Sequence, residues 1–136
     1  MKIRKYQDSD KEALIRLWRQ LFPDEPPHNE PETVIAEKLR IDDLIFVVEE
    51  NDELLGACMA GYDGHRGWLY SVGVAAEYRR KSVGKDLISH VLSSLKEMGC
   101  RKVNIQIRAG NDTAENFYKS IGFIGEDRVS MGIRID

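Results

Sequence analysis

The sequence lacks the features that identify several large protein classes. It has only two cysteines, Cys58 and Cys100, and no C-x-x-C motif, which is too few for a disulfide scaffold. No apolar run approaches the roughly 20 residues of a membrane-spanning helix, and the N-terminus lacks the apolar core of a signal peptide. The formal net charge is −3, whereas nucleic-acid binding usually needs a basic surface. We therefore expect a cytoplasmic protein with reduced, structural thiols, no metal site, and neither a membrane nor a nucleic acid as partner.

Proline is also scarce, and its placement is informative. All four prolines lie between Pro23 and Pro31, in the run F-P-D-E-P-P-H-N-E-P-E. Proline removes backbone hydrogen-bond donors, so this run predicts a loop. The loop is acidic, and it is either solvated or a lip that attracts cationic substrates. No linker, repeat or low-complexity segment interrupts the rest, so we expect one domain over residues 1–136.

Hydrophobic periodicity predicts an α+β fold. Trp18 falls on the apolar face of the first helix, where we interpret it as a core residue. Strands joined through a helix are expected to be parallel neighbours, here those around Trp68–Val74 and Lys102–Arg108. The expected elements are strands near 3–6, 44–49, 54–62, 68–74 and 102–108, with about two more in 123–135, and helices near 10–21, 32–40, 84–98 and 111–121.

The most informative stretch runs from Val72 to Gly99. It reads as a strand, a basic turn containing Arg79, Arg80 and Lys81, and an apolar-faced helix that opens near Gly84. The first N–H groups of a helix have no intrahelical partner, and the helix dipole favours negative charge there. The pattern predicts a phosphate-bearing ligand at the end of the strand, although a solvated helix-entry turn is the alternative.

A second pattern, N-x-x-A-x-x-F-Y-x-x-x-G-F, runs from Asn111 to Phe123. Together with the basic turn and the order of elements, it resembles the GCN5-related N-acetyltransferase (GNAT) superfamily over the whole chain. The segment G-Y-D-G-H-R-G, residues 61–67, looks like that of a small bacterial branch of these enzymes. The resemblance implies a mixed sheet of six to seven strands, with an antiparallel N-terminal meander, a splayed parallel pair in the middle and about four helices.

The same resemblance implies an activity and a co-substrate. It implies an N-acetyltransferase that moves acetyl from acetyl-CoA to a primary amine of a small molecule or peptide, by direct attack in a ternary complex. A non-catalytic acyl-CoA-binding or sensor module is the alternative. The implied cofactor contacts are Val72, Val74, Arg79, Arg80, Lys81, Ser82, Val83, Gly84, Lys85, Asn111 and Tyr118.

Ser82 departs from the family pattern. It stands where the family's loop usually has its first glycine. Serine keeps the N–H, and its hydroxyl could itself bond a phosphate, but it resists a positive φ. The departure therefore bears on the tightness of cofactor binding.

Tyr118 matches the tyrosine that protonates the departing thiolate in many relatives. A phenol with a pKa near 10 and a thiol with a pKa near 8.5 make that transfer feasible. The alternative for Tyr118 is a core aromatic without a catalytic role. The alternative for Asn111 is that it only caps its helix. Gln106 stands where ribosomal-protein N-terminal acetyltransferases carry a glutamate, and an amide cannot take a proton.

The general base and the acceptor stay open. The candidate bases are Asp63, His65, Glu30 or a water held near Tyr70, although an aspartate before Gly64 also fits a turn former. We expect the acceptor to enter between the proline-rich loop and the loop over 62–68. The acidic lip favours a cationic amine, whereas His65 and Arg66 favour a carboxylate or phosphate on the acceptor. An exposed final strand leaves room for a homodimer. The candidate substrate residues are Glu30, Asp63, His65, Arg66 and Tyr70.

Overall fold

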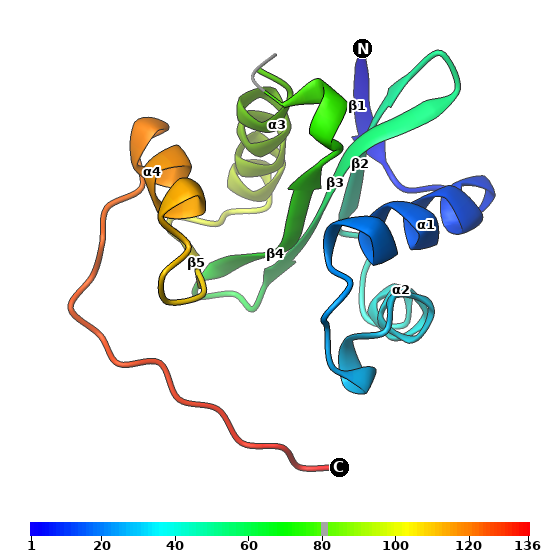
Figure 1. Cartoon of the computed structure of the whole chain (residues 1–136). Helices are drawn as coiled ribbons and strands as arrows, with labels where there is room; N and C mark the ends of the chain where they lie inside the picture. The colour runs from blue at the N-terminus through cyan, green and yellow to red at the C-terminus, as the bar shows by residue number, and fades with distance from the viewer. Residues whose placement is uncertain (80–81) are drawn as a thin grey trace. The chain divides into compact units, whose positions relative to one another are not determined.

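The computed structural model describes residues 1–79 and 82–136. They form two compact units, residues 1–106 and residues 107–136 (Figure 1), and one domain over 1–136 stays a prediction. The described elements are β1 (Lys2–Lys5), α1 (Lys11–Leu21), α2 (Pro31–Leu39), β2 (Ile45–Glu50), β3 (Glu53–Tyr62), β4 (Gly67–Val74), α3 (Val83–Glu97), β5 (Val103–Ile105) and α4 (Asp112–Ser120), with short 3-10 turns at Asp8–Asp10, Pro27–Asn29 and Ala76–Tyr78.

The first unit is built on a sheet in the order β1-β2-β3-β4-β5. β1 to β4 are antiparallel neighbours, and β4 and β5 are parallel. The predicted meander, the parallel pair and the count of four α-helices are therefore confirmed for the described residues. The predicted strand count was wrong, because this sheet has five strands rather than six or seven, and the parallel pair lies at its end rather than in its middle.

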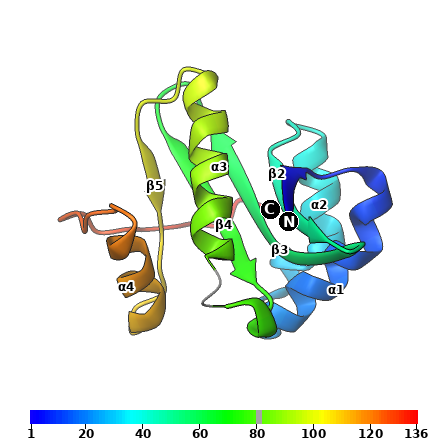
Figure 2. The ribbon, with the colours of Figure 1, turned by 90° about the horizontal axis from the view of Figure 1, so that it is seen from above.

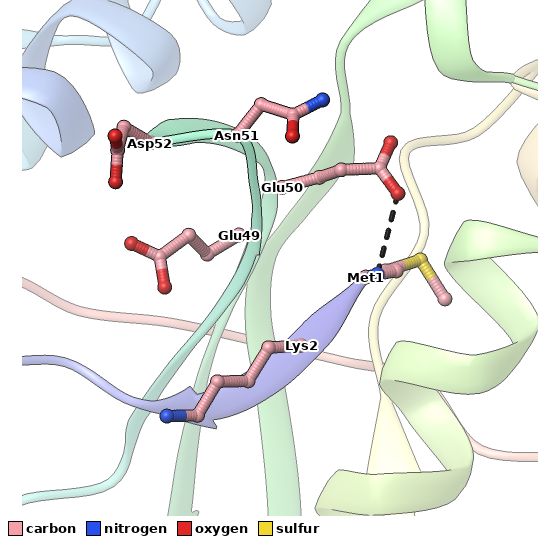
Figure 3. Close-up of a pocket in the computed structure, with 6 residues that line it drawn as sticks. All are labelled: Met1, Lys2, Glu49, Glu50, Asn51 and Asp52. Atoms are coloured by element: carbon pink, nitrogen blue, oxygen red, sulfur yellow. Dashed lines mark ion pairs between the residues drawn. The ribbon is translucent and has the colours of Figure 1, made fainter.

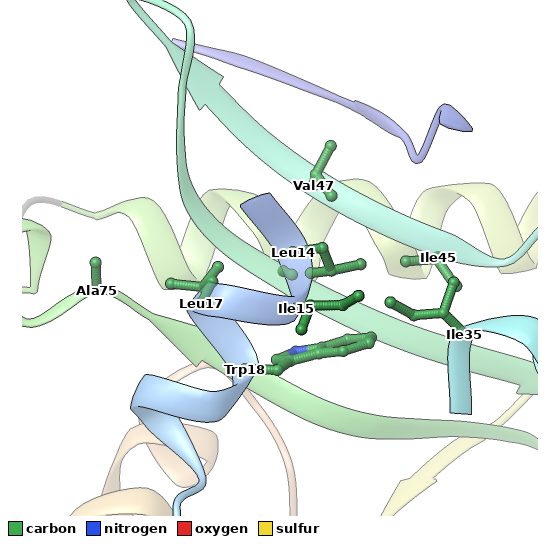
Figure 4. Close-up of a cluster of buried hydrophobic side chains, with 9 residues drawn as sticks. Leu14, Ile15, Leu17, Trp18, Ile35, Ile45, Val47 and Ala75 are labelled. Carbon is green, nitrogen blue, oxygen red and sulfur yellow. The ribbon is translucent and has the colours of Figure 1, made fainter. Parts of the chain in front are cut away.

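Helices cover both faces of the sheet (Figure 2). α1 and α2 pack on one face and α3 on the other, so β2 is buried on both sides from Ile45 to Val48. The cluster under α1 and α2 is drawn in Figure 4 and includes Trp18, which is only 3% exposed. The interpretation of Trp18 as a core residue is therefore correct.

Local sequence signals account for several element ends. Asn51 and Asp52 join β2 to β3 with φ values of 53° and 65°, the left-handed pair that a two-residue hairpin turn needs. Pro31 occupies the first turn of α2, where its missing N–H costs no helix bond. Gly99, with φ of 100°, follows the last residues of α3 as the sequence predicts.

The second unit contains α4 and an extended tail. Among the described residues no strand is assigned between 123 and 136, so the two final strands predicted there are not formed. Alternating apolar residues predict a strand only where a neighbouring strand supplies hydrogen bonds. In this tail Val129, Met131, Ile133 and Ile135 are 88–95% exposed instead.

Candidate functional site

The site region begins at the edge of β4, where its pairing with β5 stops. The parallel ladder joins Gly67 to Val103, Trp68 to Asn104 and Leu69 to Ile105. β4 continues for five more residues, to Val74, and stays paired with β3 there. The strand predicted at 102–108 is thus three residues long. The second half of β4 therefore extends past the described β4–β5 ladder, on the side where the sequence predicts a ligand.

A bulge interrupts β4 at Ser71 and Val72. Ala57 pairs with Gly73 and Met59 pairs with Tyr70, so two residues of β4 lie opposite Cys58 alone. Ser71 has a φ of 51°, a left-handed conformation that serine adopts only at a cost. The bulge turns the backbone at the point where β5 pairing has ended.

The ladder also fixes the direction of the last peptide groups of β4. The N–H of Ala75 donates to the carbonyl of Leu55 at 2.8 Å, across β3. Since directions alternate along an antiparallel strand, the N–H and carbonyl of Val74 point to the opposite edge. There the guanidinium of Arg79 donates to the Val74 carbonyl at 3.2 Å. This edge offers backbone groups and a cation to a polar, anionic ligand.

The N-terminus of α3 follows directly. α3 begins at Val83, which is buried, and Ser82 precedes it with φ of 64° and ψ of 8°. Serine thus takes the conformation for which glycine is the usual residue. Gly84 and Lys85 lie in the first turn, where N–H groups lack helix partners. Arg80 and Lys81, two of the predicted cofactor contacts, lie outside the described residues.

We expect Ser82→Gly to stabilise the folded protein by roughly 0.5–1 kcal/mol, because glycine adopts a positive φ without a Cβ penalty. Urea unfolding measures the effect. Ser89→Gly is the matched control, since Ser89 is an exposed residue inside α3, where glycine costs about 0.5–1 kcal/mol. Effects of the same sign at both positions would contradict the explanation.

The residues predicted on α4 lie in the second unit. The side chain of Asn111 accepts a hydrogen bond from the N–H of Ala114 at 3.2 Å, so it caps α4. Tyr118 is the buried residue of this helix. Its ring lies edge-on to those of Phe117 and Phe123, with centroids 5.0 and 5.4 Å away. The cap and the aromatic cluster fix the conformation of the helix that carries Tyr118.

Of the five candidate substrate residues, Glu30 has a clear structural role. Its carboxylate accepts a hydrogen bond from the N–H of Glu32 at 3.0 Å as the cap of α2, and forms an ion pair with Arg19 of α1. The hydrogen bond from Arg19 is the main cause that lowers the pKa of Glu30. A carboxylate held in this way is a weaker base.

Asp63, His65 and Arg66 form the turn between β3 and β4. The Asp63 carboxylate accepts hydrogen bonds from the N–H groups of His65 and Arg66, both at 2.8 Å. Both hydrogen bonds lower the pKa of Asp63, and the bond from Arg66 is the larger cause. The turn-forming interpretation of Asp63 is therefore the one its contacts match. Within residues 1–79 and 82–136, no described hydrogen bond or ion pair joins this turn to Glu30.

Tyr70 lies on the face of β4 that α1 and α2 cover, and it is 44% exposed. A Cβ on Gly61 would meet the Tyr70 ring at 3.8 Å and the ammonium of Lys38 at 3.9 Å, so both side chains lie over Gly61. Partial burial, together with the nearby Asp63 charge, raises the pKa of Tyr70. Tyr70 is therefore a neutral hydrogen-bonding phenol at physiological pH.

Other features of the first unit lie apart from these residues. The pocket in Figure 3 is lined by Met1 and Lys2, by the end of β2 at Glu49 and Glu50, and by the turn at Asn51 and Asp52. The N-terminal amine of Met1 pairs with Glu50 at 3.2 Å. The pocket contains none of the predicted site residues. Burial raises the pKa of the Cys58 thiol to about 12, so Cys58 is no nucleophile at neutral pH. In the described part of the chain no cluster of metal-binding side chains is found, and no helix there is long and apolar enough to cross a membrane.

The sequence did not predict one contact of the site region. The indole N–H of Trp18 donates to the carbonyl of Ser71 at 3.0 Å, joining α1 to the bulge of β4. A general signal for such a contact exists, because the N–H of a buried tryptophan usually needs an acceptor. The position of the acceptor, 53 residues away in the chain, is set by the tertiary structure.

Comparisons with known proteins agree with this architecture. A family model described as "Acetyltransferase (GNAT) family" matches residues 11–123. An acetyltransferase of Pectobacterium atrosepticum is 37% identical over 136 residues, which covers 99% of this chain and 96% of the relative. One of Yersinia pseudotuberculosis is 38% identical with the same coverage.

Solved structures share the fold at lower identity. An aminoglycoside 6'-N-acetyltransferase from Acinetobacter haemolyticus superposes with a TM-score of 0.80 at 18% identity, covering 100% of both chains. AAC(6')-Iy in complex with the bisubstrate analogue CoA-S-monomethyl-acetylneamine gives a TM-score of 0.82 at 21% identity, covering 99% of this chain and 98% of the other.

Proposed function

Because the chain belongs to the GNAT family of acetyltransferases, we propose that it transfers an acetyl group from acetyl-CoA to a primary amine. The observation that carries the proposal is the continuation of β4 past its ladder with β5, directly before the N-terminus of α3. This arrangement suits a ligand with an amide-containing arm and a pyrophosphate, which needs backbone hydrogen bonds and an anion site together.

The residues present fit this co-substrate. The outward-pointing backbone groups of Val74, and those of Val72 in the bulge, are proposed to bond the pantetheine arm. Arg79 and the first turn of α3, with Ser82, Val83, Gly84 and Lys85, are proposed to hold the pyrophosphate. Arg80 and Lys81 remain proposed contacts from the sequence alone, as does Asn111.

The proposed reaction is a direct attack in a ternary complex. The thioester supplies an activated acetyl group. The neutral amine nitrogen forms a bond to the acetyl carbon, the carbon–sulfur bond breaks, and Tyr118 donates its phenolic proton to the sulfur. The amine releases a proton to solvent water as the amide forms, and the Tyr118 phenolate regains a proton from solvent, so the enzyme returns to its starting state. The N–H of Val72 is proposed to polarise the thioester carbonyl.

The acceptor is proposed to lie on the α1–α2 face of β4, beside Tyr70. Glu30 and Asp63 both have a lowered pKa, so they are charged at neutral pH and favour a cationic acceptor. His65 and Arg66 are proposed as further contacts. Two of the solved structures named above are aminoglycoside acetyltransferases, but at 18% and 21% identity they share the fold with this chain and do not bear on its acceptor.

An amine panel tests the proposal directly. Polyamines, amino acids, aminoglycosides and short peptides are incubated with acetyl-CoA, and thiol release is followed. We expect turnover with at least one cationic amine. Binding of acetyl-CoA without turnover on any amine would instead support the acyl-CoA-binding module.

A binding prediction is independent of the acceptor. Acetyl-CoA at a hundred times its Kd adds roughly 2.7 kcal/mol to stability and raises the Tm by several degrees. Arg79→Ala removes a cation from the proposed pyrophosphate site, and we expect about tenfold weaker binding. The matched control, Arg16→Ala on the exposed side of α1, keeps the wild-type shift. No Tm shift of the wild-type protein at millimolar acetyl-CoA would refute the proposed co-substrate.

A second copy of the chain is a further proposed partner. The exposed alternating side chains of the tail, Val129 to Ile135, have the pattern of a strand that lacks a neighbour. Sedimentation of the full chain would show the dimer. A chain that stays monomeric at high concentration would contradict the proposed dimer.

A further inference from the structure

We propose that Trp18 is a positioning residue for the acetyl transfer, because it orients and polarises the peptide group whose N–H faces the thioester. This inference rests on the proposed function. It begins from the hydrogen bond of 3.0 Å that the Trp18 indole N–H donates to the Ser71 carbonyl.

The Ser71 carbonyl and the Val72 N–H belong to one planar peptide group. The structure contains no cis peptide bonds among its described residues, so in this trans unit the carbonyl and the N–H point in opposite directions. Fixing the carbonyl on Trp18 therefore fixes the Val72 N–H on the side away from Trp18. This is the donor proposed for the thioester carbonyl.

The local backbone needs such a restraint. Ser71 holds a φ of 51°, which a serine leaves readily if nothing opposes it. Leu21, the last residue of α1, and Phe22, which follows it, press on the same segment, because a Cβ on Gly73 would lie 2.5 Å from Leu21 and 3.4 Å from Phe22. The end of α1 thus packs directly on the bulge, and Trp18 supplies its polar contact.

The hydrogen bond also changes the strength of the donor. A peptide group that accepts a hydrogen bond at its carbonyl becomes a better donor at its N–H, by about 10–30% per bond. In this scheme two hydrogen bonds act in series. The Trp18 indole N–H donates to the Ser71 carbonyl, and the Val72 N–H of the same peptide group donates to the thioester carbonyl. Trp18 touches neither substrate in this scheme and acts through Val72.

The kinetic test is Trp18→Phe, which keeps an aromatic ring in the core but removes the N–H. We expect kcat to fall about tenfold, a fraction of the 10²–10³ that loss of a whole oxyanion donor costs, with the Kd of acetyl-CoA within twofold of wild type. The matched control is Ile15→Ala, buried in the same cluster with no polar atom. It should lower the Tm and leave kcat within twofold. An unchanged kcat in Trp18→Phe, or equal losses in both variants, would overturn the inference.

A spectroscopic test does not need turnover. The carbonyl band of acetyl-CoA labelled with ¹³C at the acetyl carbonyl is measured by infrared difference spectroscopy, free and bound. We expect a shift to lower frequency on binding to wild type and a smaller shift in Trp18→Phe. Identical bands in the two proteins would also overturn the inference.

Measurements on the wild-type protein distinguish failure of the proposed function from failure of the inference about Trp18. If wild type neither binds acetyl-CoA nor turns over, the proposed function has failed, and the inference fails with it. If wild type is active but the variant matches it, only the inference has failed. Should Trp18→Phe not fold, 3-(benzothiophen-3-yl)alanine at position 18 keeps the tryptophan shape without the donor and carries the same expectation.

Discussion

We expect Tyr118→Phe to lower kcat by about a hundredfold and to leave the Kd of acetyl-CoA within twofold of wild type. General acid catalysis contributes roughly 10²–10⁴ to rate, and phenylalanine has no proton to give to the departing sulfur. Phenylalanine keeps the edge-on contacts with Phe117 and Phe123, so the packing of α4 is retained. The expected loss is therefore one of turnover rather than of folding.

Steady-state kinetics by thiol release and calorimetric titration with CoA measure the two quantities separately. Tyr6→Phe makes the same chemical change at a side chain that packs on the core under α1 and α2, and kcat should stay within twofold. If Tyr118→Phe turns over at the wild-type rate, the proton comes from elsewhere. A loss of CoA affinity that equals the loss of rate would instead make Tyr118 a binding residue.

Asp10→Asn is expected to lower the free energy of unfolding by about 3 kcal/mol. Asp10 is 7% exposed, and its two carboxylate oxygens accept hydrogen bonds from Arg4 at 2.7 and 2.9 Å. One oxygen also accepts the N–H of Gln7 at 2.8 Å, at the turn that leads into α1. An asparagine would point its amide hydrogens at the guanidinium and leave a poorly paired charge.

The pH dependence of this effect follows from the pKa. The hydrogen bond from Arg4 is the main cause that lowers the pKa of Asp10 in the folded protein. A lowered folded pKa adds stability above the unfolded pKa of about 3.9, and that stability is lost as the pH falls through the folded value. Urea unfolding should therefore show a constant difference between wild type and Asp10→Asn from pH 7 to about 5, and a shrinking difference below about pH 4.

Asp43→Asn provides the matched control. Asp43 pairs with Lys5 at 3.0 Å, but its side chain is 70% exposed, and exposed pairs contribute about 0–1 kcal/mol. Equal losses in the two variants would mean that burial does not set the strength of the Arg4–Asp10 pair. No loss in Asp10→Asn would mean that Arg4 finds another partner.

Much of the helical structure could be predicted because its signals are local. The apolar spacing of α1 and α3, the cap at Asn111 and the glycine after α3 each involve residues within a few positions of one another. The strand pairs were harder. The tail after Phe123 has a strand-like alternation, but a strand also needs a partner, and the alternation cannot supply one.

By itself, the sequence determined the family, the α+β order of elements and the stretch from Val72 to Gly99 as the ligand site to test. The family follows from the resemblance of two motifs and the order of elements, whereas the elements and the ligand stretch follow from local propensity and helix-end chemistry at short spacings. Only the tertiary structure decided the number of strands, the bulge at Ser71 and the hydrogen bond from Trp18. Each of these depends on which distant segment lies alongside, and hydrogen-bond partners 53 residues apart leave no local pattern in the chain.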